Sequence, residues 1–247
     1  MRVIARLDIK NEFLIKGINL EGLRKIGNAN EIAADYYSQG IDEMIYIDSV
    51  ASLYSRDALL NILKESLLNI FVPITVGGGI INLQDAENYF LNGADKIFIN
   101  TGAINNPYLI NDLVKNYGSA NISLSIEAKQ VEKGKFNAFT SSGRDDSGLD
   151  VIDWAKEAQS RGVGEIFLTS VDNDGLQDGF NEDLINQIKN EISVPLVISG
   201  GFGKIKHLDI LDDKISGIAI GSAFHYKKTS PSKVKEHLLK NNLEVRS

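Results

Sequence analysis

Short runs of β-branched and other apolar residues alternate with longer amphipathic segments along the whole chain. The short runs have the length and composition of buried strands, and the longer segments space their apolar residues as helices do. The predicted strands lie near residues 2–8, 44–48, 73–77, 96–100, 121–127, 165–169, 195–199 and 217–221. The predicted helices lie near residues 30–39, 56–69, 83–92, 107–117, 149–161, 182–190, 204–212 and 231–241. Strands that alternate with helices pair in parallel, so these units predict one α/β domain over residues 1–247, a (βα)8 (TIM) barrel. An open doubly wound sheet is the alternative.

Several segments recur about 120 residues further along the chain. PITVGGG (73–79) matches PLVISGG (195–201), and KIFINT (96–101) resembles SGIAIGS (216–222). The repeat predicts two half-barrels, about 1–120 and 121–247, and it favours the barrel because two four-strand halves close on each other. In such a barrel the functional residues lie on the loops that follow the strands. The long segments 9–29 and 128–148, which follow strands one and five, are therefore expected to be the active-site loops.

Charge and composition exclude several classes of function. A net charge of −7 disfavours nucleic acid or an anionic membrane as a partner. The chain has no cysteine, which excludes disulfides and thiol chemistry and fits a cytoplasmic protein. Apolar runs fall short of the roughly 18 residues that a membrane helix needs, and the first residues read as a strand rather than a signal peptide. The three histidines, His207, His225 and His237, lack metal-ligand spacing, so we expect neither a metal nor a cofactor.

Four glycine-containing segments follow predicted strands at matching places in the two halves. VGGGI (76–80) and ISGGFG (198–203) follow strands three and seven, while INTG (99–102) and IGSA (220–223) follow strands four and eight. Glycine lets backbone N–H groups approach an anion closely, and each segment leads into a helix N-terminus. One such segment could be only a tight turn. Two adjacent segments in each half predict two phosphate sites on opposite sides of the barrel mouth, and hence a ligand phosphorylated at both ends.

Two carboxylates end the first strand of each half. Asp8 in IARLDIK and Glu127 in SLSIEAK lie 119 residues apart. Side chains alternate along a strand, so Asp8 shares the inward face with Arg2, Ile4 and Arg6. Two carboxylates that face one substrate suit general acid–base catalysis, with one ionised and one able to donate a proton. The alternative is that each carboxylate caps a strand end or pairs with a lysine from a loop.

The motifs ARLDIK, IKG, TVGGGI, INT, LTSVDNDG, SGGFGK and GSAFH resemble, in order and over essentially the whole chain, the cyclase subunit of imidazole glycerol phosphate synthase. The resemblance implies a (βα)8 barrel in a heterodimer with a glutaminase subunit, whose ammonia travels through the barrel. At the far end the ammonia would react with a bis-phosphorylated ribulosyl-formimino nucleotide. The products would be imidazole glycerol phosphate and an aminoimidazole carboxamide ribotide.

The resemblance also implies roles for single residues. Asp8 and Glu127 would be catalytic, Lys16 would lie on a flexible loop near the substrate, and Asp174 would contact the glycerol part of the substrate. The implied phosphate-binding residues are Gly79, Asn100 and Thr101 for one phosphate, and Gly200, Gly201, Gly221 and Ser222 for the other.

A charged gate at the bottom of the barrel, where ammonia enters, is a further feature of this family. The matching positions are Arg2, Glu43, Lys96 and Glu165, each at the start of its strand. Two basic and two acidic side chains in a ring can neutralise one another, as buried charges must. The ring could be a plain structural plug, but the resemblance implies an ammonia entrance and therefore a glutaminase partner.

Three positions depart from the pattern of the cyclase. Glu127 stands where the family has an aspartate, and a carboxylate displaced by about 1 Å can lower a rate about 10²-fold. Arg6 points inward where a small or neutral residue is expected, and it needs a carboxylate partner, which either Asp8 or Glu127 could supply. The acid in that pair would be held ionised and would be unsuited to donating a proton. GNAN (27–30) replaces the usual Gly-Asp-Pro turn.

These departures resemble a paralogous branch that serves surface-glycan synthesis. Its members pair with a glutaminase-like subunit and a separate sugar amidotransferase that makes acetamidino sugars. We therefore expect this chain to belong to that branch, with a phosphorylated ligand still bound by the two glycine-rich sites. The authentic cyclase of histidine biosynthesis is the alternative, and the sister isomerase of the same pathway is a third possibility.

Overall fold

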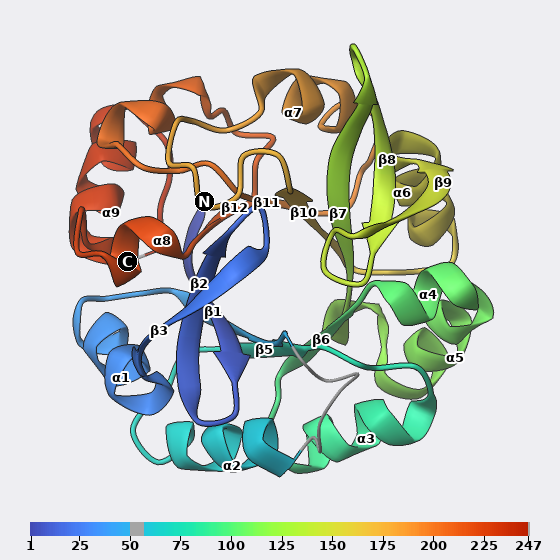
Figure 1. Ribbon diagram of the computed structural model, residues 1–247, viewed down its shortest axis with the longest axis horizontal. Helices are drawn as coiled ribbons and strands as arrows, with labels where there is room; N and C mark the ends of the chain where they lie inside the picture. Colours follow the sequence, from blue (N-terminus) through green and yellow to red (C-terminus); the bar gives the residue numbers. More distant parts are fainter. Residues whose placement is uncertain (50–56, 247) are drawn as a thin grey trace.

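The computed structural model describes residues 1–49 and 57–246, which form a closed parallel barrel surrounded by helices (Figure 1). The barrel strands follow the order β10-β11-β12-β1-β4-β5-β6-β7, and β7 pairs with β10 to close the ring. These strands are β1 (Arg2–Lys10), β4 (Glu43–Asp48), β5 (Ile74–Gly77), β6 (Lys96–Ile99), β7 (Ile122–Glu132), β10 (Glu165–Ser170), β11 (Leu196–Ser199) and β12 (Gly217–Ile220). All eight predicted strands are therefore present, and the (βα)8 fold is confirmed.

Helices cover the outside of the barrel. Seven of the eight predicted segments contain an α-helix, and two short helices, Thr101–Asn105 and Ser222–His225, were not predicted. The α-helices are α1 (Ala29–Ser38), α2 (Asp57–Ser66), α3 (Leu83–Leu91), α4 (Thr101–Asn105), α5 (Tyr108–Tyr117), α6 (Val151–Ser160), α7 (Glu182–Ile188), α8 (Ser222–His225) and α9 (Pro231–Lys240). Short 3-10 helices are η1 (Ser119–Asn121) and η2 (Ile205–Ile210). The α-helix predicted near 204–212 is wrong, because the segment forms the short 3-10 helix η2 and the backbone is already extended at Leu211. Within η2 only Leu208 is buried, which is too little apolar surface to stabilise a full α-helix. No helix of the described residues has the length and apolar content to cross a membrane.

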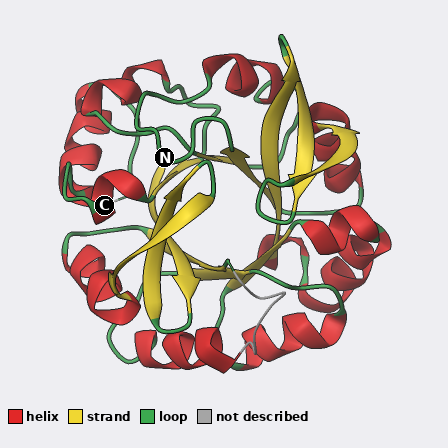
Figure 2. Cartoon of the chain, viewed as in Figure 1, coloured by secondary structure: helices red, strands yellow, loops and turns green. Residues whose placement is uncertain are grey.

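The two long segments after strands one and five contain strands that the sequence pattern did not predict. Segment 9–29 folds into β2 (Phe13–Ile18) and β3 (Glu21–Asn28), and segment 128–148 contains β8 (Lys135–Thr140) and most of β9 (Asp145–Asp150). Antiparallel pairing joins β2 to β1 and β8 to β7, so the β2–β3 and β8–β9 pairs extend the barrel strands β1 and β7 (Figure 2). The unusual GNAN segment ends β3, and there the Asn28 side chain accepts hydrogen bonds from the N–H groups of Asn30 and Glu31 to cap α1.

Alternation along the strands divides the buried side chains into two sets. On β1, Val3, Ala5 and Leu7 belong to the large core between barrel and helices. Ile4 instead belongs to a small apolar layer inside the barrel, made of Ile4, Ile45, Phe98, Phe167, Val197 and Ala219. The predicted inward face of the first strand is therefore confirmed.

Equivalent turns in the two halves have similar backbone conformations. Gly78 and Gly79 have φ of 112° and 67°, and Gly200 and Gly201 have φ of 93° and 100°. The residue before α4, Asn100, has φ −129° and ψ −90°, close to φ −110° and ψ −84° at Gly221 before α8. The glycine-rich segments thus form the same turn twice, after β5 and β6 and again after β11 and β12.

Candidate active site

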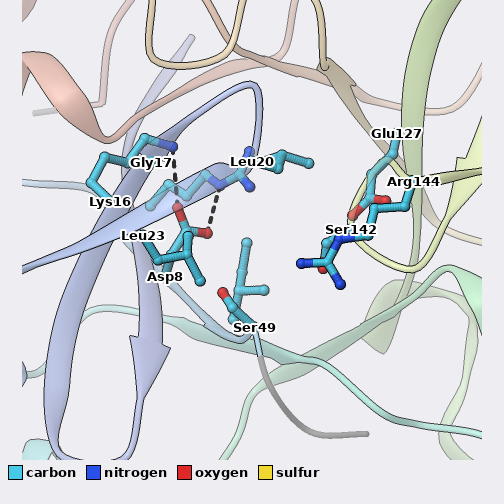
Figure 3. A pocket seen from close by; sticks show the side chains of 11 residues that line it. Asp8, Lys16, Gly17, Leu20, Leu23, Ser49, Glu127, Ser142 and Arg144 are labelled. Atoms are coloured by element: carbon cyan, nitrogen blue, oxygen red, sulfur yellow. Dashed lines mark hydrogen bonds and ion pairs between the residues drawn. The ribbon is translucent and has the colours of Figure 1, made fainter.

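A cavity lies at the carboxyl ends of the barrel strands, beneath the β2–β3 and β8–β9 pairs. Its lining residues are Arg6, Asp8, Lys16, Gly17, Leu20, Leu23, Ile47, Ser49, Glu127, Ser142 and Arg144. Asp8 and Lys16 stand on one side of this cavity and Glu127, Ser142 and Arg144 on the other (Figure 3). The two acids predicted from the repeat therefore face one cavity, as expected.

Asp8 is held by two cations. The Arg6 Nε atom donates to Asp8 Oδ1 at 3.1 Å, and the Lys16 Nζ atom donates to Asp8 Oδ2 at 3.2 Å. Burial by itself raises the pKa of the Asp8 carboxyl, but the charges of Arg6 and Lys16 outweigh it and lower the pKa to about 2. Asp8 is consequently an ionised carboxylate at any physiological pH.

Lys16 lies on β2 and is buried, whereas the resemblance implied a flexible loop. Its Nζ atom donates to Asp174 Oδ2 at 2.7 Å as well as to Asp8. The hairpin formed by β2 and β3 is bonded to the segment after β10, since the Asn19 N–H donates to the Asp174 carbonyl at 2.7 Å. Gly175 allows this close contact, since a Cβ atom there would lie 2.4 Å from the Gly17 carbonyl oxygen. The hairpin thus brings Lys16 and Asp174 together beside Asp8.

Arg6 crosses the barrel interior below the acids. Its Nη1 atom donates to Thr169 Oγ1 at 3.2 Å and to Ser199 Oγ at 3.3 Å. The same atom lies 3.9 Å from Asp174 Oδ1. Of the two partners that the sequence left open, Asp8 is the one that Arg6 engages directly.

Among the residues that the structure describes, the hydrogen bond to Glu127 comes from the Gly143 N–H, which donates to its Oε2 atom at 2.8 Å. Burial raises the pKa of Glu127 to about 7, against the lowering effects of the Gly143 N–H and of the Arg6 charge. The nearby carboxylates of Asp8 and Asp174 add to the rise in pKa. Glu127 can therefore carry a proton near neutral pH, which Asp8 cannot.

The turn between β8 and β9 contributes residues that the sequence analysis missed. Ser142 and Gly143 have φ of 60° and 75°, and they direct the Gly143 N–H at Glu127 and the Arg144 side chain toward the cavity (Figure 3). The available signal was the Ser-Ser-Gly-Arg sequence, because consecutive small polar residues and glycine favour a left-handed turn.

The predicted phosphate segments lie at the barrel mouth in two places. In the closed sheet, β1 and β4 lie between the β11–β12 pair and the β5–β6 pair on one side, while β7 and β10 separate them on the other. Glycine is required there, since a Cβ atom on Gly200 would lie 2.5 Å from the Ser170 carbonyl oxygen and one on Gly201 1.9 Å from the Gly179 carbonyl oxygen. Their role in phosphate binding stays a prediction.

Side chains of the first of these segments are engaged with the β8–β9 region. Asn100 donates through Nδ2 to the Phe139 carbonyl at 3.0 Å, and Thr101 Oγ1 accepts from the Ser141 N–H at 3.3 Å. Ser222, in the second segment, is buried at the start of α8. Gly79 lies in the turn after β5, which matches the turn of Gly201 after β11. Gly221 precedes α8, as Asn100 precedes α4.

The four charged residues at the bottom of the barrel do form a ring. Arg2 Nη1 lies 3.0 Å from Glu43 Oε1, and Arg2 Nη2 lies 2.5 Å from Glu165 Oε2. Lys96 Nζ lies 3.9 Å from Glu43 Oε2 and 3.7 Å from Glu165 Oε2. Ser123 donates a further hydrogen bond to Glu165 at 3.0 Å. Each acid therefore contacts both cations, as the predicted gate requires.

Histidines do not contribute to the cavity. Nδ1 of His225 lies 2.7 Å from the Tyr36 hydroxyl, and burial is the main cause that lowers the pKa of His225 to about 4. His207 accepts from the Gly203 N–H at 3.2 Å, and His237 lies 2.7 Å from Asp209. Within residues 1–49 and 57–246, no group of three or more potential metal ligands occurs.

The chain is similar to known proteins over nearly its whole length. The family model described as Histidine biosynthesis protein matches residues 2–230. Imidazole glycerol phosphate synthase subunit HisF of Legionella pneumophila is 50% identical over 209 residues, which cover 85% of this chain and 99% of that relative. The protein of the same name from Endomicrobium trichonymphae is 37% identical over 247 residues, which cover 100% of this chain and 95% of that relative.

Proposed function

Since the chain belongs to the family of HisF subunits of imidazole glycerol phosphate synthase, a family of cyclases, we propose that it catalyses the synthase reaction of histidine biosynthesis. Ammonia and a bis-phosphorylated ribulosyl-formimino nucleotide would give imidazole glycerol phosphate and an aminoimidazole carboxamide ribotide. The observation that carries this proposal is the pair of acids, one ionised and one protonated near neutrality, that face one cavity.

The chemistry of ring formation needs both protonation states. Ammonia that adds to a carbonyl carbon must lose protons, and the ribotide that leaves as an amine must gain one. The Asp8 carboxylate can accept a proton and the Glu127 carboxyl can donate one, with the pKa of Glu127 matched to neutral pH. Lys16 borders the same cavity, and Asp174, which accepts a hydrogen bond from Lys16 at 2.7 Å, would contact the glycerol part of the substrate.

The two glycine-rich sites would hold the two phosphates. Their positions on opposite sides of the mouth suit a ligand with a phosphate at each end, and backbone N–H groups of the glycine-rich turns would donate to the phosphates. The proposed contacts are Gly79, Asn100 and Thr101 for one phosphate, and Gly200, Gly201, Gly221 and Ser222 for the other.

Ammonia would come from a glutaminase subunit in a heterodimer. The ring of Arg2, Glu43, Lys96 and Glu165 surrounds the barrel axis at the end opposite the cavity, where an incoming small molecule would enter. A ring of neutralised charges leaves no unpaired charge to hold an ammonium ion at the entrance.

The expected place in an acetamidino-sugar branch receives no support from the relatives. Both carry the name of the synthase subunit, which favours the alternative of histidine biosynthesis. A sugar amidotransferase partner likewise has no support. The structure also weakens the argument from Arg6, because Arg6 engages Asp8 and leaves Glu127 able to carry a proton.

Turnover by the isolated chain tests the proposal. Purified protein supplied with the ribulosyl nucleotide and an ammonium salt should release imidazole glycerol phosphate and the carboxamide ribotide, measured by chromatography or mass spectrometry. Glu127→Gln should abolish this release while Glu127→Asp retains it. Absence of product from the wild type and from Glu127→Asp alike would refute the proposal, and turnover without ammonia would favour the isomerase.

A further inference from the structure

Arg6 is the residue whose placement the synthase chemistry does not explain. Its side chain is only 5% exposed, starts on β1, passes β12 and reaches hydroxyl groups on β10 and β11. Below it lies the apolar layer of the barrel interior, and above it lie Asp8 and the cavity. A guanidinium in such a position is costly unless carboxylates compensate it.

The guanidinium of Arg6 contacts Asp8 and Asp174 but not Glu127. Nε donates to Asp8 at 3.1 Å, and Nη1 donates to the two hydroxyls and lies 3.9 Å from Asp174. Neither its Nε atom nor its Nη1 atom bonds to Glu127, whose hydrogen bond comes from the Gly143 N–H instead. Among the described residues, the Nη2 atom of Arg6 has no hydrogen bond, although the guanidinium borders the cavity.

The balance of buried charges shows how the placement of Arg6 affects the protonation of Glu127. Arg6 and Lys16 supply two positive charges, and Asp8 and Asp174 supply two negative charges that pair with them. Glu127 is a third carboxyl on the same cavity, and ionising it would leave one buried negative charge in excess. A carboxyl in that situation takes up a proton.

We propose that Arg6 is a positioning residue that divides the proton-transfer work between the two acids, fixing Asp8 as the ionised partner and leaving Glu127 as the one that exchanges a proton with the substrate. The inference rests on the proposed cyclase function for its role in turnover. The charge division itself is a property of the protein without substrate. A chain without this guanidinium would have three acidic groups around the one buried ammonium of Lys16, and two of them would compete for protons.

Charged and titratable groups from several elements surround Asp8 and its cavity. They are Arg6 on β1, Lys16 on β2, Asp174 after β10, Glu127 on β7 and His225 on α8, with Arg144 of the β8–β9 turn on the opposite wall. Burial is the main cause that keeps the pKa of His225 near 4, so it is neutral over the range in which Glu127 titrates. Lys16 remains beside Asp8 when Arg6 is replaced, so the expected change is partial.

Carboxyl-labelled NMR titrations of the protein without substrate test the charge division directly. In the wild type the Asp8 signal should stay ionised from pH 4 to 9, and the Glu127 signal should titrate near pH 7. Asp8→Asn and Glu127→Gln assign the two signals. In Arg6→Met the Asp8 midpoint should rise by about 1–3 pH units, the effect of one adjacent opposite charge, while Arg6→Lys should restore part of the wild-type behaviour.

Arg161→Met is the matched control, because Arg161 bonds to Glu157 and Asn111 on the outside of the barrel. It should leave both titrations at their wild-type midpoints. If Arg6→Met fails to fold, the titration of the wild type still tests the inference. A wild type in which Asp8 titrates near neutral pH, while Glu127 is already ionised there, would overturn it. An Asp8 midpoint in Arg6→Met equal to that of the wild type would overturn it as well.

The pH profile of ammonium-driven kcat/KM links the charge division to turnover. The wild type should lose activity only above about pH 7, as Glu127 ionises, whereas Arg6→Met should gain a second, acidic limb as Asp8 takes up a proton. Identical profiles for the two proteins would overturn the role in catalysis. Expected titrations combined with no wild-type turnover would refute the cyclase function and leave the charge division standing.

Discussion

Glu127→Gln should increase the stability of the folded chain at alkaline pH while it removes the proposed proton donor. The pKa of Glu127 is raised from 4.5 to about 7, chiefly by burial. A raised carboxyl pKa means that the folded state resists ionisation. Glu127 therefore costs no stability well below pH 4.5, destabilises increasingly between pH 4.5 and about 7, and costs a constant amount above that. A shift of about 2.5 units at about 1.4 kcal/mol per unit amounts to roughly 3 kcal/mol. Glutamine cannot ionise and keeps an oxygen that accepts from the Gly143 N–H.

Unfolding measurements at two pH values isolate this effect. Urea titrations of both proteins at pH 5 and pH 9 should give a stability difference that moves by roughly 3 kcal/mol in favour of Glu127→Gln, or about 6–12 °C in melting temperature. Effects of His225 and Asp8 are common to both proteins and cancel. The exposed Glu12→Gln is the control and should show no such movement. A difference between wild type and Glu127→Gln that stays constant between the two pH values would refute the reasoning.

Three further substitutions test other parts of the molecule. Lys16→Met leaves two buried carboxylates short of a cation, so urea unfolding should show a loss of about 3 kcal/mol and kcat/KM should fall. Gly201→Ala places a Cβ atom 1.9 Å from the Gly179 carbonyl oxygen, so it should raise KM and lower the melting temperature more than Gly118→Ala, which has positive φ but open space. Glu165→Gln breaks the charged ring, and with a glutaminase subunit present it should lower glutamine-driven turnover more than ammonium-driven turnover.

The barrel could be predicted from the sequence because its signals are local and repeated. Buried strands such as Leu196–Ser199 are short apolar runs, and the glycines at 78 and 200 mark turns that only glycine forms easily. The β2–β3 pair was missed, since in β3 most side chains are exposed and the segment lacks a clear alternation of apolar and polar residues. Such strands exist because they pair with a neighbour, which a single-sequence pattern does not reveal.

The chemical state of the site could be predicted only in part. Alternation along β1 was enough to place Asp8 and Arg6 on the inward face. The choice of Asp8 over Glu127 as the partner of Arg6 depends on the burial of Lys16 by the hairpin and on the Gly143 N–H, both tertiary features. The sequence therefore identified the acids and the unusual arginine, and the three-dimensional arrangement was needed to assign the proton.

The apolar layer inside the barrel has a consequence for how this chain can vary. It includes Phe98 and Phe167, whose ring centroids are 5.7 Å apart, and it lies between the charged ring below and the charged groups around Asp8 above. Within residues 1–49 and 57–246, the two charged sets share no hydrogen bond or ion pair, and free-energy effects of substitutions without shared partners are nearly additive. Mutations that adapt the lower face to a new partner can therefore accumulate without changing the pKa values of Asp8 and Glu127, so the two ends of the barrel can evolve independently.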